Sequence, residues 1–190
     1  MADTKRVILE EAVKLFAKDG YEAVSVEMIA EAVGIKAPSL YKHYKSKRDI
    51  FDHILREMER RDAVNASECD VPTGTTEEMP EAYRSTDVDG LLAFCRLQFR
   101  YWTQDSFASP FRRMLTLEQY RSPEMRDLYH QYLGAGPLEY VQDLVGSREK
   151  ALTLYGPMFL LYSIADAAED KEKTAALLDR HLENWRSENC

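Results

Sequence analysis

The sequence predicts an all-α fold, for three reasons. Apolar residues recur three or four positions apart along most of the chain, as they do on one face of a helix. Glycine, proline and serine stand between these segments, at positions that suit helix ends. The alternation of apolar and polar residues that marks a half-buried strand is absent. We therefore expect helices throughout the chain.

Four helices are predicted in the first third of the chain, over residues 4–19, 26–33, 37–44 and 47–66. Gly20 and Gly34 follow the first two helices, where glycine commonly ends a helix. Ser25 is suited to cap the start of the second helix, and Ser46 is suited to cap the fourth. Pro38 lies in the first turn of the third helix, where its missing N–H breaks no hydrogen bond.

The remaining predicted helices cover 87–104, two segments that begin near residues 109 and 122, and the ranges 148–168 and 171–187. A polar stretch over residues 69–76 is predicted to be a loop. The helix over 87–104 is apolar on most sides, so we expect it at the centre of a core. Residues 134–137 should break or kink the segment that begins near residue 122, and Pro157 should kink the helix that contains it.

The net charge of −8 argues against binding of nucleic acid by the surface as a whole, so the distribution of charge along the chain matters more than its sum. Residues 1–60 hold 11 basic and 11 acidic side chains, which places the whole acidic excess in the later part. Five basic residues and no acidic one fall between positions 36 and 48: Lys36, Lys42, Lys45, Lys47 and Arg48. A local basic patch on an acidic protein suits contact with DNA through one face.

Residues 26–44 match a helix-turn-helix in length and in the turn at Gly34. The second helix of such a motif enters the major groove, and residues 37–39 are small enough to allow this. Leu40 is expected to face inward, whereas residues 41–44 offer phenol, ammonium and imidazole groups to phosphates and base edges. On spacing alone, two packed helices with a solvated basic face explain the segment equally well.

The stretch over residues 28–51 resembles the DNA-binding signature of the tetracycline-repressor family. In one-letter terms the signature is IAxxxGxxxxxxYxHFxxKxxLF, and it is met by Ile29, Ala30, Gly34, Tyr41, His43, Lys47 and Phe51. Phe16, Gly20 and Tyr21 match the end of the family's first helix. The resemblance covers roughly residues 4–55. It implies a homodimer that binds a pseudo-palindromic operator, with two recognition helices about one DNA turn apart.

The resemblance also implies roles for eight residues. The positions that face bases in the family match Lys36, Ala37, Ser39 and Lys42. The positions that hold phosphates match Ser25, Tyr41, His43 and Lys47, the last from the start of the fourth helix. Packing is the alternative role for Tyr41 and His43, and capping alone is the alternative for Ser25. Two departures leave the operator sequence open: Lys36 stands where a Ser or Thr cap is common, and Val24 stands where Thr is common.

By the same resemblance, residues 1–48 form a helix-turn-helix DNA-binding domain, and residues 49–190 form a larger ligand-binding and dimerisation domain. The last two helices are the expected interface of the homodimer, because two helices from each subunit can form a four-helix bundle. The faces expected there consist of Leu154, Met158, Leu161, Tyr162 and Ala165, and of Leu177, Leu178, His181, Leu182 and Trp185. Core packing within one subunit is the alternative for these faces.

Aromatic residues are concentrated between positions 83 and 162. Most should be ordinary core, but several are candidates to line a pocket for a small hydrophobic or aromatic ligand, which a few polar side chains would orient. The candidate ligand contacts are Phe94, Phe99, Arg100, Trp102, Glu118, His130, Tyr155 and Phe159. The mechanism that the resemblance implies is a ligand-driven shift of the fourth helix, which releases a repressor from DNA. Activation, and a ligand that acts as corepressor, remain alternatives.

Other function classes are not expected. The three cysteines (Cys69, Cys95 and Cys190) have no metal-ligand or disulfide spacing, so neither a metal nor a cofactor is predicted. Nucleotide-binding, protease and hydrolase motifs are absent, so an enzyme with catalytic residues is not predicted. Without a membrane-spanning run or a signal peptide, we expect the protein in the cytoplasm. The alternative function is a small-molecule sensor of the same fold that does not read DNA.

Overall fold

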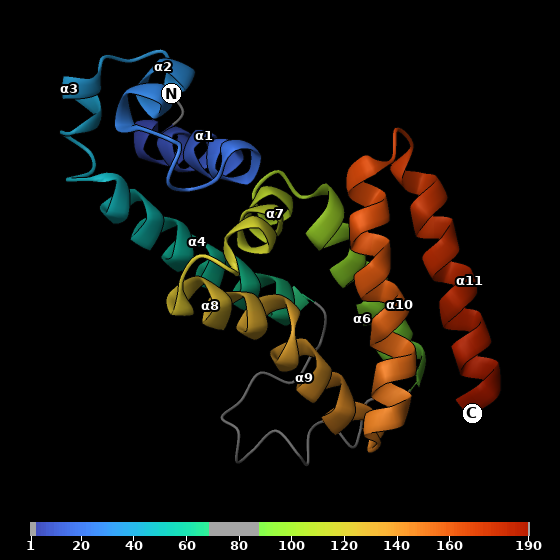
Figure 1. Ribbon diagram of the computed structural model, residues 1–190. Helices are drawn as coiled ribbons and strands as arrows, with labels where there is room; N and C mark the ends of the chain where they lie inside the picture. Colours follow the sequence, from blue (N-terminus) through green and yellow to red (C-terminus); the bar gives the residue numbers. More distant parts are fainter. Residues whose placement is uncertain (1–2, 69–87, 190) are drawn as a thin grey trace. The chain divides into compact units, whose positions relative to one another are not determined.

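The computed structural model describes residues 3–68 and 88–189 and confirms the all-α fold (Figure 1). Its helices are α1 (Thr4–Asp19), α2 (Val26–Val33), α3 (Ala37–Leu40), α4 (Lys47–Glu68), α6 (Val88–Gln104), α7 (Ala108–Glu118), α8 (Pro123–Leu133), α9 (Ala135–Val145), α10 (Arg148–Ala167) and α11 (Lys171–Asn189). No strand occurs within the described ranges. None of these helices is long and apolar enough to cross a membrane. The loop predicted over residues 69–76 lies outside the described residues.

The signals of helix ends act where they were predicted. Ser25 Oγ accepts a hydrogen bond of 3.2 Å from the Met28 N–H at the start of α2. Ser46 Oγ accepts one of 3.1 Å from the Asp49 N–H at the start of α4. Gly34 ends α2 with a φ of 77°, in the left-handed region that residues with a side chain rarely adopt. These three residues therefore fix both ends of α2 and the start of α4.

The third helix is shorter than predicted, because it covers residues 37–40 and not 37–44. Beyond Leu40 the chain continues in tight turns, in which the N–H groups of Lys42 and His43 donate to carbonyls three residues back. Such hydrogen bonds are typical of a 3₁₀ helix, whose course is close to that of an α-helix. The other helix ends that were predicted lie within two residues of their expected positions, whereas α9 was not predicted as a separate helix.

The chain divides into two compact units, which we describe separately. The first comprises the described residues up to Val64 together with Ser106–Tyr129. The second comprises the described residues of Asn65–Asp105 and of His130–Cys190. The functional boundary after residue 48 is a different division and stays a prediction.

In the first unit, α1 packs against α2 and α7, and α3 packs against α2. Its fully buried side chains come from α1, α2, α3, α4, α7 and the residue before α7: Phe16, Ile29, Leu40, Phe51, Phe111 and Phe107. Leu40 is completely buried, as predicted, and burial of a leucine contributes roughly 1.5–3 kcal/mol. A single side chain thus anchors α3 and leaves the rest of this helix at the surface.

In the second unit, α10 packs against α6, α9 and α11, and α6 also packs against α11. The rings of Phe99 in α6 and Tyr162 in α10 stack with centroids 5.6 Å apart. The indole N–H of Trp185 in α11 donates to the Thr153 hydroxyl of α10 at 3.1 Å. Figure 1 shows α10 and α11 as neighbouring helices, and α10 continues through Pro157. Apolar faces of these helices form one core.

The faces predicted for the dimer interface were therefore assigned wrongly in large part. Leu154, Met158, Leu161, Tyr162, Ala165, Leu178, Leu182 and Trp185 are buried within the single chain. They are buried because α10 and α11 pack against each other and against α6. The apolar residues that stay exposed are Leu152, Phe159, Leu160 and Ile164 on α10, none of which belongs to the predicted face, and Leu177 on α11, which does.

Candidate nucleic-acid interface

The exposed side of the helix-turn-helix consists of residues around the buried Leu40. Tyr41 is 50% exposed, Lys36 and Lys42 are exposed, and Ala37, Ser39 and His43 are half-buried. We call these six residues the reading face. They lie on α3, on the residue before it and on the turn after it, so the structure brings six of the eight predicted DNA contacts together. Lys36 precedes α3 without a side-chain cap, as predicted.

Ser25 is the cap of α2, which is the local role predicted for it. Its hydroxyl oxygen accepts the Met28 N–H, and its hydroxyl proton is donated to the Glu27 carboxylate, whose pKa is lowered by its own backbone N–H and by this bond. A phosphate at the start of α2 would be attracted by the positive end of the helix but would compete with Glu27 for this donor. The capping bond can stay in place during a phosphate contact, whereas the bond to Glu27 cannot.

Tyr44 does not belong to the reading face, although a polar contact with DNA was expected of it. The residue is 2% exposed, and its hydroxyl donates to the Lys5 carbonyl at 3.1 Å. Burial raises the pKa of this phenol to about 12. Its ring meets the His53 imidazole edge to face, with centroids 5.0 Å apart. Tyr44 is thus a core residue that ties the end of the motif to α1 and α4.

Lys47 is only half-exposed and makes contacts inside the protein. Its ammonium donates to the Tyr21 carbonyl at 2.7 Å and to the Glu22 carbonyl at 3.2 Å. It also lies 4.5 Å from the centroid of the Tyr21 ring. Since an ammonium has three N–H donors, two of them are already used. The predicted phosphate contact of Lys47 would compete with these bonds.

Arg48, which belongs to the basic patch predicted to suit contact with DNA, is paired with carboxylates. Its guanidinium donates to both oxygens of Glu124, at 2.8 and 2.6 Å, and to Asp52 at 2.7 Å. These bonds raise the pKa of Arg48, and the bond from Arg48 lowers the pKa of Glu124. The side chains of Arg48 and Glu124 are 53% and 45% exposed, so the pair contributes roughly 0–1 kcal/mol. The positive charge of the basic run is therefore concentrated on Lys36, Lys42 and Lys45.

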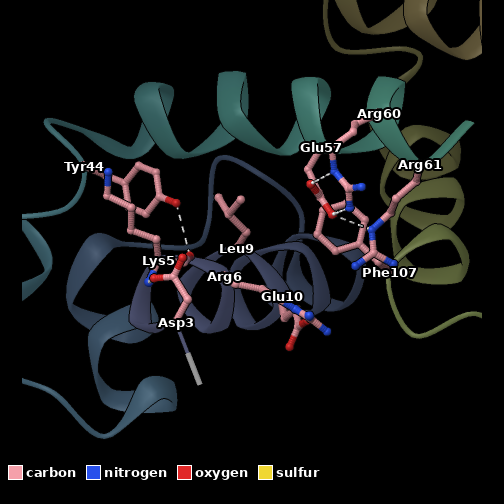
Figure 2. A pocket seen from close by; sticks show the side chains of 10 residues that line it. All are labelled: Asp3, Lys5, Arg6, Leu9, Glu10, Tyr44, Glu57, Arg60, Arg61 and Phe107. Atoms are coloured by element: carbon pink, nitrogen blue, oxygen red, sulfur yellow. Dashed lines mark hydrogen bonds and ion pairs between the residues drawn. The ribbon is translucent and has the colours of Figure 1, made fainter. Parts of the chain in front are cut away.

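A cleft of about 260 Å³ lies in the same unit, lined by α1, α4 and Phe107 (Figure 2). The Glu57 carboxylate accepts hydrogen bonds of 2.8 Å from both Arg60 and Arg61. These bonds, led by that from Arg60, lower the pKa of Glu57 to about 2. The Arg61 guanidinium lies 4.5 Å from the centroid of the Phe107 ring. The charges at this end of the cleft satisfy one another, which favours a structural role over ligand binding.

The predicted ligand contacts are dispersed. Seven of the eight lie in the second unit: Phe99 and Trp102 are buried, Phe94 and Tyr155 are half-buried, and Arg100, His130 and Phe159 are exposed. The Tyr155 hydroxyl donates to the Leu133 carbonyl at 2.8 Å. Glu118 lies in the first unit, where its carboxylate accepts the Tyr21 N–H at 3.0 Å. Sequence offered no signal for this bond, because its partners are 97 residues apart.

No group of His, Cys, Asp and Glu that could hold a metal occurs within the described ranges.

Comparison with known proteins gives matches in the N-terminal part. Residues 8–54 match the family model of bacterial regulatory proteins of the tetR family. Over 74 residues the chain is 34% identical to the HTH-type transcriptional regulator YhgD of Bacillus subtilis, and over 47 residues it is 45% identical to the repressor ComR of Escherichia coli. These matches cover 37% and 25% of this chain, but only 38% and 22% of the two relatives. The chain thus spans less than two fifths of their length.

Solved structures resemble the chain over nearly its whole length. The fatty acid degradation regulator FadR from Bacillus halodurans has a TM-score of 0.64 at 19% identity, and the match covers 97% of this chain and 95% of that one. A transcriptional regulator from Saccharomonospora viridis, solved in complex with choline, has a TM-score of 0.63 at 19% identity, with 96% and 97% covered. At this level of identity the likeness concerns the fold.

Proposed function

We propose that the chain, whose residues 8–54 match the family model of bacterial regulatory proteins of the tetR family, is a transcriptional repressor released from DNA by a small ligand. It binds a pseudo-palindromic operator as a homodimer, in the cytoplasm. The observation that carries this proposal is the reading face, where a short helix anchored by Leu40 exposes Lys36, Tyr41 and Lys42.

The residue types of the reading face suit DNA. Lysines at positions 36 and 42 can bind guanine O6 and N7 or a phosphate, and the Tyr41 phenol can donate to a phosphate oxygen. Ala37 and Ser39 are small, which lets the backbone of α3 approach the base edges. Ser25 and His43 add donors for phosphates. Because the acidic excess lies beyond residue 60, the attraction to DNA is confined to this part of the chain.

The homodimer would form through the exposed apolar stripe of α10. Leu152, Leu160 and Ile164 are 48%, 61% and 42% exposed, and their spacing in multiples of four places them along one side of the helix. Leu177 on the adjacent α11 is 41% exposed. Two helices from each subunit would bury these residues in an intermolecular four-helix bundle. A dimer supplies the two reading faces that a pseudo-palindrome requires.

A small hydrophobic or aromatic ligand would bind among the helices of the second unit. A regulator of similar fold was solved in complex with choline, a small organic cation, which supports a small molecule as the effector. Phe94 and Tyr155 are the best placed of the predicted contacts, because they are half-buried aromatic residues. Glu118 is better explained by its bond to Tyr21. To release DNA, the ligand must bind more tightly to the state that does not fit the operator.

Selection of bound duplexes from a random DNA pool tests the proposal. The purified chain should enrich an inverted repeat whose half-sites lie about one helical turn apart. Binding of the enriched duplex should weaken steeply between about 50 and 200 mM salt, because phosphate contacts release counterions. The Lys42→Ala variant is the matched comparison, since its side chain is exposed and its loss should leave the fold intact. Failure of the wild-type chain to enrich any duplex, also with cell extract added, would favour a sensor that does not read DNA.

A further inference from the structure

The backbone of Tyr21, in the turn between α1 and α2, is held from two sides by side chains of distant segments. Its N–H donates to Oε1 of Glu118 at 3.0 Å, and its carbonyl accepts a bond of 2.7 Å from the Lys47 ammonium. The three residues belong to the first unit. We call this arrangement, the Glu118 carboxylate, the Tyr21 peptide groups and the Lys47 ammonium, the Tyr21 clamp.

Glu118 occupies a buried position at the end of α7, with 1% of its surface exposed. Its second oxygen lies 3.5 Å from Nε of Arg121. Gly20 makes room for the carboxylate, because a Cβ at this position would lie 3.0 Å from Oε1, and its φ of 84° also favours glycine. A carboxylate is expensive to bury unless it is paired and hydrogen-bonded. Its place here is explained by the bond to the Tyr21 backbone.

The Tyr21 side chain extends the clamp into the core. Its ring centroid lies 5.1 Å from that of Phe16 in α1 and 5.3 Å from that of Phe51 in α4. Lys47 lies against the same ring. Any displacement of Glu118 or Lys47 therefore acts on a turn that is packed against both α1 and α4.

A second link joins the segment that follows α7 to the start of α4. Arg48, next to Lys47 in the chain, binds both carboxylate oxygens of Glu124 at the start of α8. Residues 118–124, from the end of α7 to the start of α8, thus contribute a buried carboxylate to the turn before α2 and an exposed one to the start of α4.

We propose that Glu118 and Lys47 are positioning residues for DNA recognition, which hold the turn before α2 and thereby set the orientation of the reading face relative to α7. Ser25 begins α2 four residues after Tyr21, and α3 packs on α2, so a shift of the Tyr21 backbone moves the whole motif. Lys47 then acts within the protein and not on a phosphate. This assignment rests on the proposed function, because it gives the two residues a part in binding the operator.

Salt dependence separates the two roles of Lys47. The full-length wild type, Lys47→Gln and Lys42→Gln are compared on the duplex that the wild type enriches. Loss of one phosphate contact per subunit lowers the slope of log Kd against log salt by about 0.9, hence by about 1.8 in a dimer. Lys47→Gln should leave this slope unchanged while it weakens binding and lowers Tm. A slope reduced by about 1.8 in Lys47→Gln would make Lys47 a phosphate contact and overturn its assignment.

The role of Glu118 is tested by Glu118→Ala and Glu118→Gln, with exposed Glu31→Gln as the control. Exchange of the Tyr21 amide hydrogen should accelerate about tenfold in Glu118→Ala, and less in Glu118→Gln, which keeps an acceptor oxygen. The preference of the protein for its operator over a duplex with one base pair inserted between the half-sites should also fall, more in Glu118→Ala than in Glu118→Gln. A residue that only stabilises the fold would lower Tm without changing this preference.

The outcomes are distinct. A wild-type chain that enriches no duplex contradicts the proposed function, and the amide exchange of Tyr21 still shows whether the clamp exists. A wild-type chain that binds its operator, while Glu118→Ala keeps both the slow exchange and the spacing preference, contradicts the positioning role alone.

Discussion

The reading face and the aromatic residues of α6 and α10 differ in how their side chains are used. The reading face comprises six residues within eight consecutive positions, and its lysines and Tyr41 are exposed around one buried leucine. In α6 and α10 the aromatic residues come from segments about 60 positions apart, and Phe99 and Tyr162 bury their rings against each other. A DNA contact needs exposed groups at fixed local spacing, whereas a ligand pocket needs a cavity that only tertiary packing creates. The first is therefore a local property of the chain, and the second is not.

The largest effect should follow the removal of an aromatic ring from the packed residues of α6 and α10. Phe99→Ala should lower the free energy of unfolding by about 3–5 kcal/mol, because Phe99 is 1% exposed and stacks on Tyr162. Urea denaturation measures the change. Phe159→Ala is the comparison, since Phe159 is 38% exposed and its removal should cost less than that of Phe99. Equal losses in the two variants would mean that Phe99 is not part of a tightly packed core.

Dimer formation through the exposed apolar stripe of α10 should be sensitive to an introduced charge. Leu160→Asp should raise the dissociation constant of the dimer about a hundredfold or more, because an unpaired carboxylate would be buried between subunits. Sedimentation of the purified chain at several concentrations measures this. Leu117→Asp, at an exposed leucine of α7, should leave the dimer unchanged. A variant Leu160→Asp that remains dimeric would place the interface elsewhere.

A smaller effect is expected in the reading face, and on affinity instead of stability. Tyr41→Ala should weaken operator binding about 10- to 100-fold, which is about 1–3 kcal/mol, with little change in Tm. The side chain is half exposed, so its removal leaves no cavity. Titration of the enriched duplex measures the loss, and Tyr120→Ala, at a tyrosine that is 90% exposed, serves as the control. Loss of stability without loss of affinity would make Tyr41 a packing residue.

The smallest effect concerns the ion pairs beside the cleft. The folded pKa of Glu57, about 2, is below its ordinary value of 4.5, so its contribution to stability is complete above pH 4.5 and is lost as pH falls toward 2. Glu57→Gln should destabilise the chain by about 1–2 kcal/mol at neutral pH and reduce the acid sensitivity between those values. Denaturation at several pH values tests this, with exposed Glu59→Gln as the control. An unchanged pH profile would mean that Arg60 and Arg61 do not hold Glu57 in solution.

The sequence predicted the helices and the grouping of residues 36–43 around the buried Leu40 because both depend on neighbours along the chain. Ser25, Gly34 and Leu40 could be assigned from their positions relative to helix ends. The partners of Glu118 could not, since the bond to Tyr21 spans 97 residues. The dimer face was misplaced for a related reason. Both sides of α10 carry apolar residues, and only packing against α6 and α11 shows which side is left exposed.

Photo-cross-linking from the reading face tests DNA recognition most directly. A photoreactive phenylalanine replaces Tyr41 in one variant and Tyr120 in the other, two exposed tyrosines of the first unit. Each is irradiated on the duplex that the wild type enriches. We expect a cross-link from position 41 to the half-sites of that duplex and little from position 120. Absence of a cross-link from position 41, in a variant that still binds the duplex, would contradict the assignment of residues 36–43 as the surface that reads DNA.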